Sequence, residues 1–318
     1  MLDLHRLRLL REFAERGTIA ATAAALGYTP SAVSQQLAAL EREVGMALLD
    51  RTARSAELTD AGRRLASHAE RILAQVEEAE ADLTAAAQEP SGRVSVAAFP
   101  TAAAALAPAL ARSLRAHPGL TLLLKQTQRG EGLRQVSSAE VDVALVDDWS
   151  GGLAGPVPAN TESALLRFYP LVRDPLVLVV PRGHRLADPG EPVDLRQLRE
   201  TSRWMAAPSG EPSRQAVDLL LAGVGGAPPV PWEFEGLGTI LSLVSRGIGI
   251  AAVPRLALAA GEARVVVREL PDGSPARQVY AVARAASVRR PSVAVILTAL
   301  HDGAAHLPGR SGGPRLTP

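Results

Sequence analysis

The sequence predicts an α+β multidomain chain with a helical N-terminal part, one long helix and a C-terminal α/β part. Three observations predict this organisation. Residues 18–41 read as two short helices around a glycine turn, residues 59–87 carry a periodic apolar pattern, and short apolar runs alternate with helical segments from Arg93 onward. At 318 residues the chain is long enough for more than one hydrophobic core.

The helix pair within residues 18–41 has defined start and stop signals. Gly27 follows the last apolar residue of the first helix, where a left-handed C-terminal position favours glycine. Thr29 suits the N-cap of the second helix, and Pro30 suits its first position because proline has no N–H to leave unpaired. The predicted buried stripe of the second helix is Val33, Leu37, Leu40 and Val44.

The outward face of the second helix suits contact with DNA. Ser and Gln side chains can donate to and accept from base edges and phosphates, and glutamine can bind adenine through two hydrogen bonds. On these residues alone, the alternative is a helical hairpin of an ordinary domain with a polar solvent face. The candidate DNA contacts in this helix are Thr29, Pro30, Ser31, Ala32, Ser34, Gln35 and Gln36.

The charge of the N-terminal part limits the kind of DNA binding. Residues 1–60 carry seven basic and eight acidic side chains, a formal balance of −1. Affinity for phosphates then depends on Arg51 and Arg54, on hydroxyl groups and on helix N-termini. This favours a specific, dimeric DNA-binding protein over one that coats DNA.

The segment around the helix pair resembles the LysR-type transcriptional regulators. The match runs through A-x-x-L-G-x-T-x-S-A-V-S-x-Q-L-x-x-L-E from Ala23 to Glu41, the L-x-R step from Leu49 to Arg51, and LT-x-AG from Leu58 to Gly62. The resemblance implies a winged helix-turn-helix domain at residues 1–60, with the helix-turn-helix at about 18–37 and Arg51 and Arg54 in the wing.

Three positions depart from the family pattern. Thr22-Ala23 stands where the family usually has two alanines, and Leu49 where it usually has phenylalanine. Both are modest changes of polarity or volume. The frequent Gln-Pro pair at the start of the second helix is Pro30-Ser31 here, so the operator sequence of relatives does not carry over.

The long helix predicts dimerisation. Thr59 suits its N-cap, and its apolar side chains alternate steps of four and three, as in a coiled-coil seam. The alternative is one amphipathic helix lying on its own domain; the resembled family pairs through a linker helix, placed here at residues 61–90. Pro90 and Gly92 mark its end. The predicted seam is Leu65, Ala69, Ile72, Val76, Ala79 and Leu83, followed by Ala86.

The C-terminal part resembles the two-lobed effector-binding domain of the same family, with a fold like that of type 2 periplasmic binding proteins. Apolar runs at 93–98, 120–127 and 141–146 predict a parallel sheet, and runs at 165–173 and 175–181 predict two further strands. The resemblance implies an effector-binding domain at 91–308. Its lobe I is expected at about 91–163 and 270–308, its lobe II at about 164–269, and a disordered tail at 309–318.

A small-molecule effector is expected between the lobes. Ligands of open α/β sheets bind beyond the carboxyl ends of strands, often at a helix N-terminus, and could be anionic here. The hydroxyl of Thr101 would hold the effector, or would only cap its helix; Phe99 would line the pocket or belong to the core. The resemblance implies effector contacts at Phe99, Pro100, Thr101, Thr127, Gln128, Ser209, Gly247 and Ile248.

The residues give little support for an enzyme. Gly247–Ala252 fits G-x-G-x-x-A, but it leads into a predicted strand, whereas a dinucleotide fingerprint opens a helix. The histidines show no ligand spacing, so neither a metal site nor a cofactor is expected. Asp142, Asp147 and Asp148 flank a strand end, where we expect solvated loop charges rather than an acid and a base.

The sequence therefore predicts a DNA-binding transcriptional regulator controlled by a small-molecule coinducer, acting as a homodimer or homotetramer. A two-lobed binding protein of the transport kind is the alternative, and the helix pair and the lack of a signal peptide argue against it. No apolar run reaches the length of a membrane span, so we expect a cytoplasmic protein. The chain has no cysteine, which excludes disulfides and thiol-based redox sensing.

Overall fold

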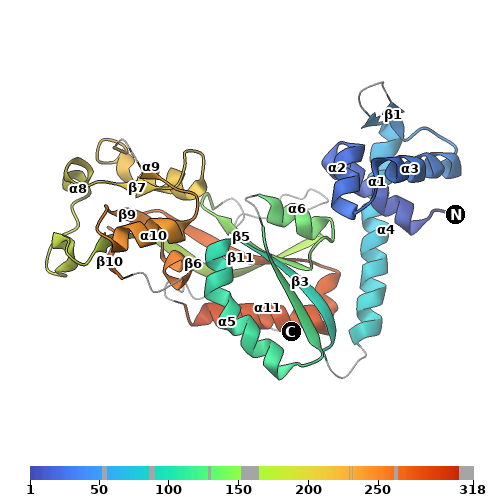
Figure 1. The fold of residues 1–318 in the computed structure, drawn as a ribbon. Helices are drawn as coiled ribbons and strands as arrows, with labels where there is room; N and C mark the ends of the chain where they lie inside the picture. Colours follow the sequence, from blue (N-terminus) through green and yellow to red (C-terminus); the bar gives the residue numbers. More distant parts are fainter. Residues whose placement is uncertain are drawn as a thin grey trace.

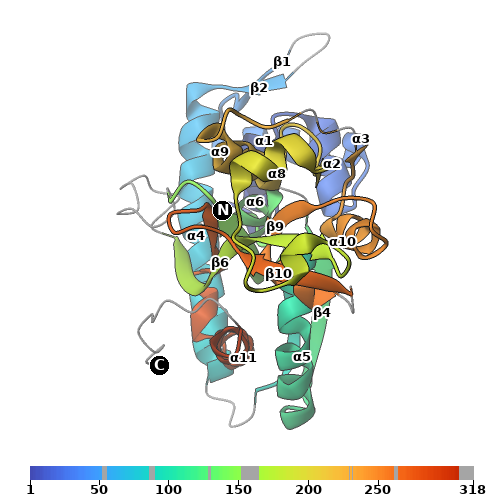
Figure 2. The same ribbon diagram turned by 90° about the vertical axis from the view of Figure 1, so that its left-hand side faces the viewer.

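The chain forms three parts in sequence order: a helical N-terminal domain, the long helix α4, and an α/β part with two lobes (Figure 1; Figure 2). The lobe that contacts α4 is lobe I, and the distal one is lobe II. The computed structural model describes residues 1–51, 56–85, 90–127, 130–151, 165–228, 230, 232–260 and 264–307.

The N-terminal domain confirms the predicted helix pair. Gly27 ends α2 with a positive φ of 71°, and the Thr29 hydroxyl accepts from the Ala32 N–H at 3.2 Å to cap α3. Pro30 is the first residue of α3. The elements are α1 (Leu4–Arg16), α2 (Ile19–Leu26), α3 (Pro30–Val44), β1 (Leu49–Arg51) and β2 (Ala56–Leu58), and β1 and β2 pair antiparallel as the wing.

Two of the departures from the family pattern fit the core of this domain. Thr22 is fully buried, and its hydroxyl donates to the Thr18 carbonyl at 2.8 Å, so no polar atom of this side chain is left unpaired. Leu49 is 5% exposed and lies in the same core as Phe13. The smaller side chain at Leu49 is therefore accommodated inside the domain.

Helix α4 (Asp60–Ala85) begins inside the N-terminal domain and leaves it. The Thr59 hydroxyl accepts from the Gly62 N–H at 3.0 Å, as expected for an N-cap. Ala66 and Ala69 are buried in the domain core, against which Leu65 and Ile72 also pack. The core of the N-terminal domain thus extends past residue 60, where the sequence predicted its end.

One sheet runs through both lobes, in the order β10-β6-β11-β5-β3-β4, with β9 also paired to β6. The parallel sheet expected from the runs at 93–98, 120–127 and 141–146 is confirmed, since β3 pairs parallel with β4 and with β5; β11, in contrast, is antiparallel to both β5 and β6. The reason is that the chain returns from lobe II into the middle of lobe I. The elements of lobe I are β3 (Gly92–Ala98), α5 (Pro100–Ala116), β4 (Leu120–Gln126), α6 (Glu131–Ser137), β5 (Val143–Asp148), β11 (Ala276–Arg284), η4 (Ser287–Arg289) and α11 (Pro291–Ala305).

Helices cover both faces of the lobe I sheet. Helices α5 and α11 lie on one face, where Val96, Leu106 and Ile296 share a core. Helix α6 lies on the other face, where Val136 packs with Tyr280. Helix α4 passes the end of the sheet where β11 leads into η4, and α6 lies on the side of the sheet toward the N-terminal domain (Figure 1).

Lobe II is reached by a single long strand, β6 (Leu166–Pro181). The sequence predicted two strands here, at 165–173 and 175–181, on either side of Asp174. Strand β6 pairs with β11 as far as Pro175 and with β9 and β10 from Leu176 onward, so the predicted lobe boundary at 163 comes too early. The other elements of lobe II are η2 (Arg185–Ala187), α8 (Leu195–Thr201), β7 (Met205–Ala206), α9 (Pro212–Ala222), β8 (Trp232–Glu233), α10 (Leu237–Ser245), β9 (Ala251–Pro254), η3 (Arg255–Ala260) and β10 (Val265–Glu269).

Candidate functional site

The N-terminal half of α3 forms an exposed polar surface beside the wing. Ser31 and Gln35 are exposed, and Ser34 is partly exposed between them. Arg51 at the end of β1 donates from Nη1 to the Ser34 hydroxyl at 2.9 Å. The wing and α3 thus present one continuous group of hydrogen-bonding side chains. The other predicted contacts on this surface are Thr29 and Pro30, both exposed, and Ala32, which is partly exposed.

Glu41 fixes the wing against α3. Its Oε1 accepts from the N–H groups of Leu48 and Leu49, both at 2.9 Å, and its Oε2 lies 3.6 Å from Arg51 Nη2. A carboxylate that accepts two backbone N–H groups holds the start of β1 in place. In the sequence, Glu41 was noted only as the last residue of the family motif. In the structure, its contacts position Arg51 beside α3.

Gln36 and Arg54 are the two predicted DNA contacts that this surface does not include. Gln36 faces α1, where its Oε1 accepts from Arg6 Nε at 3.0 Å, and Arg6 is also ion-paired with Glu43. The helical turn carries Gln36 to the side of α3 next to α1; it is partly exposed, and its contact with DNA stays a prediction. Arg54 lies outside the described residues.

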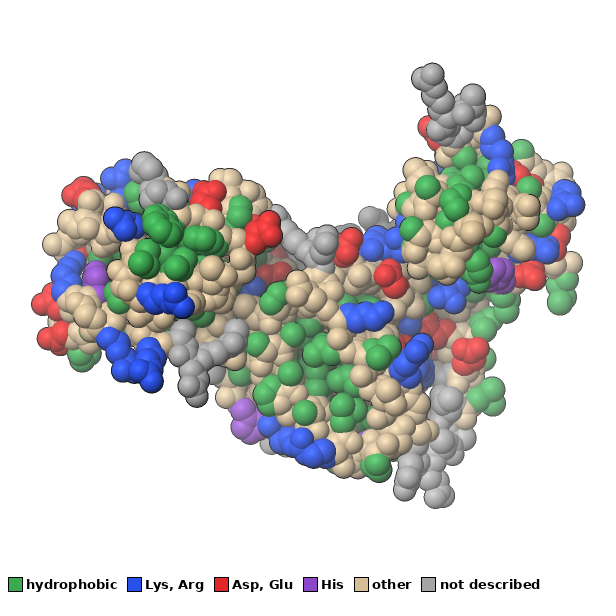
Figure 3. Space-filling view, in the orientation of Figure 1, with side chains coloured by type: hydrophobic (Ala, Val, Ile, Leu, Met, Phe, Trp, Pro, Cys, Tyr) green, Lys and Arg blue, Asp and Glu red, His purple; other side chains and the backbone are tan. Residues whose placement is uncertain are grey.

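Most basic side chains of the N-terminal domain are paired within it. Arg6 pairs with Glu43, and Arg11 and Arg16 both pair with Glu12, which is 1% exposed. On the face shown in Figure 3, basic and acidic side chains are interspersed over this domain rather than gathered into one patch. The domain therefore presents no concentrated positive patch on this face, in line with its formal charge balance.

The predicted seam of α4 divides into two parts. Ala69 is wrong as a dimer contact, because it has no exposed surface and belongs to the core of its own domain. Leu65 and Ile72 are partly buried against the same core. Beyond them Val76 is half-buried, while Ala79 is exposed and Leu83 is 79% exposed. The second half of the helix therefore carries an uncovered apolar stripe.

The start of α5 gathers two predicted effector residues around an arginine. The N-cap of α5 is Phe99, which makes no side-chain cap bond, and Pro100 is the first helical residue. Thr101 is therefore no N-cap. Its side chain is 7% exposed, and its hydroxyl accepts from Arg277 Nη2 at 2.8 Å.

Arg277, at the start of β11, is the centre of this site. Its Nε donates to Asp174 Oδ2 and its Nη1 to Asp147 Oδ2, both at 2.9 Å. The guanidinium carbon lies 4.7 Å from the ring centre of Phe99 and 5.7 Å from that of Trp149, within the range of cation–π attraction. Phe99 thus contacts the lobe I core and this charged group together.

Asp174 ties Arg277 to lobe II. It is 1% exposed, and its Oδ1 accepts from the N–H of Leu256 in η3 at 2.9 Å. Burial raises the pKa of the Asp174 carboxyl above its usual value, while Arg277 and the Leu256 N–H act in the opposite direction. Arg277 and the Leu256 N–H thus favour the charged form of Asp174, which lies on β6 just before this strand enters lobe II.

The remaining predicted effector residues do not meet at Arg277. Thr127 is buried and donates to Gln135 Oε1 at 3.0 Å, and Gln128 lies outside the described residues. Ser209 and Gly247 are exposed in lobe II, before α9 and after α10, and Ile248 next to Gly247 is partly buried. Among described residues, no hydrogen bond joins Ser209, Gly247 or Ile248 to Phe99 or Thr101.

The three aspartates near β5 are not solvated loop charges, contrary to expectation. Asp142 accepts from Ser95 N at 2.8 Å and from Arg290 Nη1 at 2.7 Å. Asp147 pairs with Arg277. Asp148 is 7% exposed and accepts from Ser150 N at 2.9 Å. The sequence gives no signal for these partners, which come from distant segments or from a turn.

The G-x-G-x-x-A segment lies in a turn that leads into a strand. Gly247–Ala252 runs from the end of α10 into β9, and a Cβ on Gly249 would lie 2.3 Å from the Arg203 carbonyl oxygen. The described part of the chain holds no group of three His, Cys, Asp or Glu side chains arranged for a metal ion. Within the same residues, no helix has the length and apolar character needed to cross a membrane.

Two family models match the chain. "Bacterial regulatory helix-turn-helix protein, lysR family" matches residues 4–63, and "LysR substrate binding domain" matches residues 87–305. The two models together cover the N-terminal domain and both lobes.

Curated relatives cover almost the whole chain. An uncharacterized HTH-type transcriptional regulator of Shigella flexneri is 29% identical over 328 residues, 98% of each chain. One of Mycobacterium tuberculosis is 31% identical over 282 residues, 85% of this chain and 86% of the relative. The probable hydrogen peroxide-inducible genes activator of Streptomyces viridosporus is 28% identical over 319 residues, 97% of this chain and 96% of the relative.

Solved structures share the fold. Full-length OxyR from Pseudomonas aeruginosa, solved as a variant, superposes with a TM-score of 0.68 at 20% identity and covers 99% of each chain. CbnR, described as a LysR family transcriptional regulator, superposes with a TM-score of 0.51 at 23% identity, covering 95% of this chain and all of the other. At these identities the likeness concerns the fold alone.

Proposed function

The chain belongs to the LysR family of bacterial transcriptional regulators, and from this premise we propose which residues read its operator and which respond to its effector. Members of the family bind DNA through the helix-turn-helix domain and carry an effector-binding domain. The family consists of regulators rather than enzymes, and we propose no catalytic activity for this chain. Binding to operator DNA would place the protein in the cytoplasm.

We propose that α3 enters the major groove with the first turns of its polar face, and that Arg51 contacts the adjacent phosphate backbone. The observation that carries this proposal is the hydrogen bond between Arg51 and Ser34, which joins wing and helix into one surface. Gln35 is the exposed side chain with the chemistry for base readout. The set consists of Thr29, Pro30, Ser31, Ala32, Ser34, Gln35 and Arg51.

Operator binding can be measured by footprinting and fluorescence anisotropy on the DNA flanking the gene of this protein. Arg51→Ala is expected to weaken binding and to reduce the slope of log affinity against log salt by about 1, because one phosphate contact is lost. Gln35→Ala is expected to lose about 1–3 kcal/mol on the specific site but not on random DNA.

Arg112→Ala is the matched control for Arg51, since Arg112 is an exposed arginine on α5, far from the wing. Its salt dependence should equal that of the parent protein. If Arg51→Ala binds with the parent slope, the wing does not contact phosphate. If the parent protein gives no salt-sensitive footprint, the proposal that its operator lies in the DNA flanking its own gene is wrong.

We propose that the effector acts at the N-terminus of α5, beside Thr101 and Arg277. A carboxylate on the effector could replace Asp147 at Arg277 Nη1, since Asp147 is the more exposed of the two carboxylate partners, 26% against 1% for Asp174. An effector bound there would alter the contacts that join the lobes. Thiol chemistry takes no part, because none of the 318 residues is cysteine.

A thermal-shift screen of carboxylate-bearing metabolites on the full chain tests this site, because a ligand of the folded state raises the melting temperature. A positive ligand should lose its shift in Arg277→Gln and keep it in Arg255→Gln, whose arginine pairs with Glu269 in lobe II. An unchanged shift in Arg277→Gln would exclude Arg277 from the effector site.

We propose that two copies pair through the second half of α4. Its uncovered apolar stripe consists of Val76, Ala79 and Leu83, with Leu65 and Ile72 at the edge of the N-terminal core. Two such helices side by side would place two α3 helices on neighbouring half-sites of an operator. The effector lobes could join such dimers into a tetramer.

A further inference from the structure

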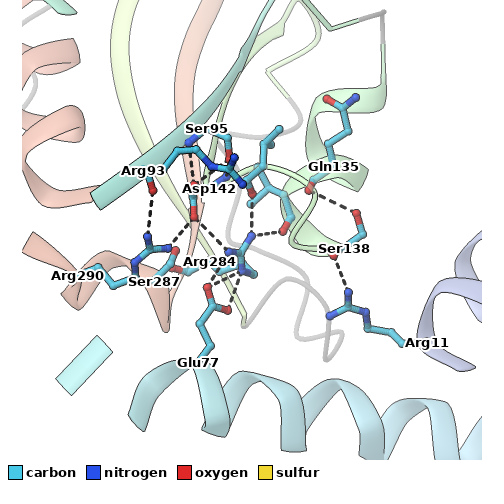
Figure 4. A network of polar contacts seen from close by, with 12 residues as sticks. Arg11, Glu77, Arg93, Ser95, Gln135, Ser138, Asp142, Arg284, Ser287 and Arg290 are labelled. Carbon is cyan, nitrogen blue, oxygen red and sulfur yellow. Dashed lines mark hydrogen bonds and ion pairs between the residues drawn. The ribbon is translucent and has the colours of Figure 1, made fainter. Parts of the chain in front are cut away.

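The N-terminal domain and α4 are bound to lobe I by a network of polar contacts (Figure 4). The network lies at the end of the lobe I sheet where β5 and β6 begin and β11 ends, next to the C-terminal end of α6. Its arginines come from three places: α1, the end of β11, and the first residue before α11. Each of them reaches a segment far away in the sequence.

Arg284, at the end of β11, makes the central contact. It is 9% exposed, and its Nη1 donates to the carbonyls of Val136 and Val141 at 2.7 and 2.8 Å. Its Nε and Nη2 donate to the two carboxylate oxygens of Glu77 on α4, at 2.8 and 2.6 Å. Lobe I therefore holds the guanidinium in one orientation and presents its free edge to α4. Such two-pronged pairs are specific in direction.

Asp142 lies close to the Arg284 guanidinium and adds a second negative charge beside it. Its Oδ1 lies 3.9 Å from Arg284 Nη2 and accepts from Arg290 Nη1 at 2.7 Å, while its Oδ2 accepts from Ser95 N at 2.8 Å. Asp142 is thus fixed to β3 and to the start of α11. The charge of Arg284 is balanced by Glu77 and Asp142 together, which offsets the cost of its burial.

The loop of residues 138–141, which we name the junction loop, also binds α1. Arg11 is 8% exposed and donates from Nη2 to the Ser138 carbonyl at 2.5 Å. Arg16 Nη2 lies 3.2 Å from Glu140 Oε2. Since Val141 in the same loop holds Arg284, this loop contacts the N-terminal domain directly and α4 through Arg284.

The same elements lead to the region of the proposed effector site. Gln135 of α6 accepts from Thr127 through its side chain, and its carbonyl accepts from Glu140 N at 2.9 Å and from Val141 N at 3.1 Å. Strand β11 carries Arg277 at one end and Arg284 at the other. Helix α6 therefore joins Thr127 to the network, and strand β11 joins the N-terminal end of α5 to it.

We propose that Glu77 and Arg284 are positioning residues that lock α4, and with Arg11 the DNA-binding domain, to lobe I. In this state the direction of α3 relative to lobe I is set by the Glu77–Arg284 pair. Releasing the pair frees α4 to change its angle on lobe I. The inference does not depend on the identity of the effector or of the operator, so its test can fail while the proposed function stands.

The test measures the distance between the N-terminal domain and lobe I in solution. Since the chain has no cysteine, Asp50→Cys in the wing and Arg112→Cys on α5 introduce two spin labels without background. Double electron–electron resonance then reports the distance distribution. An excess of unlabelled protein dilutes the sample, so that pairs within one chain dominate.

Glu77→Gln keeps the size of the side chain and removes its charge, and Glu78→Gln makes the same change one residue further on. Glu78 pairs with Arg289 at 2.8 Å, but both side chains are exposed, 42% and 58%. We expect one narrow distance peak for the parent and for Glu78→Gln, and a broadened peak with a shifted mean for Glu77→Gln. Arg284→Lys, which keeps the charge but not the fork geometry, should also broaden the peak.

The melting temperature and circular dichroism of each variant separate a change of orientation from a loss of folding. The proposal is overturned when Glu77→Gln and Glu77→Ala both melt cooperatively and both have the parent distance distribution. If Glu77→Gln keeps one hydrogen bond to Arg284 and masks the effect, Glu77→Ala removes it. An unchanged distance in both Glu77 variants leaves the pair without a positioning role.

Discussion

Gly62 is a position at which a single added carbon would collide with the backbone. A Cβ there would lie 2.1 Å from the Leu48 carbonyl oxygen and 3.0 Å from Leu58 Cδ2. The close approach lets the start of α4 pack on the wing. Because the nearest atom belongs to the backbone, it cannot move aside at low cost.

We predict that Gly62→Ala lowers the free energy of unfolding of the N-terminal domain by about 3 kcal/mol, at the upper end for overpacking. Urea unfolding followed by circular dichroism measures this. Gly183→Ala is the control, because a Cβ at Gly183 meets nothing within 4 Å. Equal stability of Gly62→Ala and the parent would mean that the wing and α4 separate readily.

We expect His184 to make the stability of lobe II depend on pH. Its Nδ1 accepts from the Leu186 N–H at 3.2 Å, which requires an unprotonated nitrogen, and burial together with Arg185 lowers the pKa of the imidazole below its usual value near 6.5. The unfolded state then binds more protons than the folded state just below pH 6.5. Stability contributed by His184 is present above that pH and lost as the pH falls below it.

We predict that the melting temperature of the parent falls more steeply between pH 7 and pH 5 than that of His184→Asn. Asparagine can accept at the same cap without titrating. Differential scanning fluorimetry across this range measures the difference. Parallel curves for the two proteins would show that the cap does not depend on the protonation of His184.

Arg277 shows why some site residues escape sequence reasoning. Its partners Asp174, Asp147 and Thr101 lie 103, 130 and 176 residues away along the chain. No local pattern distinguishes an arginine that meets two carboxylates and a hydroxyl from one on the surface. Thr101 was predicted because it follows a strand end directly, and Arg277 was not predicted because only the fold brings it there.

At the scale of elements, the helices could be predicted and the sheet only in part. The ends of α2 and α3 depend on Gly27, Thr29 and Pro30, which act on their immediate neighbours. The antiparallel return of β11 into lobe I is a pairing between distant segments. Pro170 and Pro175 also lie within β6, where proline normally argues against a continuous strand.

The exposed C-terminal end of α4 leads to a prediction about dimerisation. Leu83 is 79% exposed in one chain, and we expect it to be buried between two copies. Leu83→Glu places two like charges in that contact and should raise the dimer dissociation constant at least about tenfold, or 1.4 kcal/mol. Sedimentation velocity measures it.

Gln75→Glu is the matched control, since it adds the same charge to an exposed position of α4 outside the predicted seam. Its dissociation constant should remain close to that of the parent. If both variants dimerise like the parent, the two copies pair elsewhere and α4 is not the dimer contact.

At the scale of the whole molecule, β6 joins the two lobes into one structural unit. Leu178 and Val180 of β6 are fully buried in lobe II, and Val172 of the same strand is buried in lobe I. A strand shared by two cores transmits the loss of packing in one to the other.

We predict that Leu178→Ala, at a cost of about 2–5 kcal/mol, reduces protection from hydrogen exchange in β5 and β11 of lobe I as well as in lobe II. Leu40→Ala is the control, since Leu40 is equally buried but lies in the N-terminal domain. It should leave both lobes protected. Loss of protection confined to lobe II in Leu178→Ala would mean that the lobes unfold separately.

The crossing between the lobes also defines where this protein can be divided. Pro175 and Ala276 are paired neighbours on β6 and β11, and the Leu176 N–H donates to the Pro275 carbonyl at 3.0 Å. The chain thus leaves lobe I and re-enters it at adjacent backbone positions, so lobe II is connected like an inserted module. A short turn from Pro175 to Ala276 would close β6 and β11 into a hairpin. In a separate design, lobe II could be exchanged for that of a relative at the same pair of junctions.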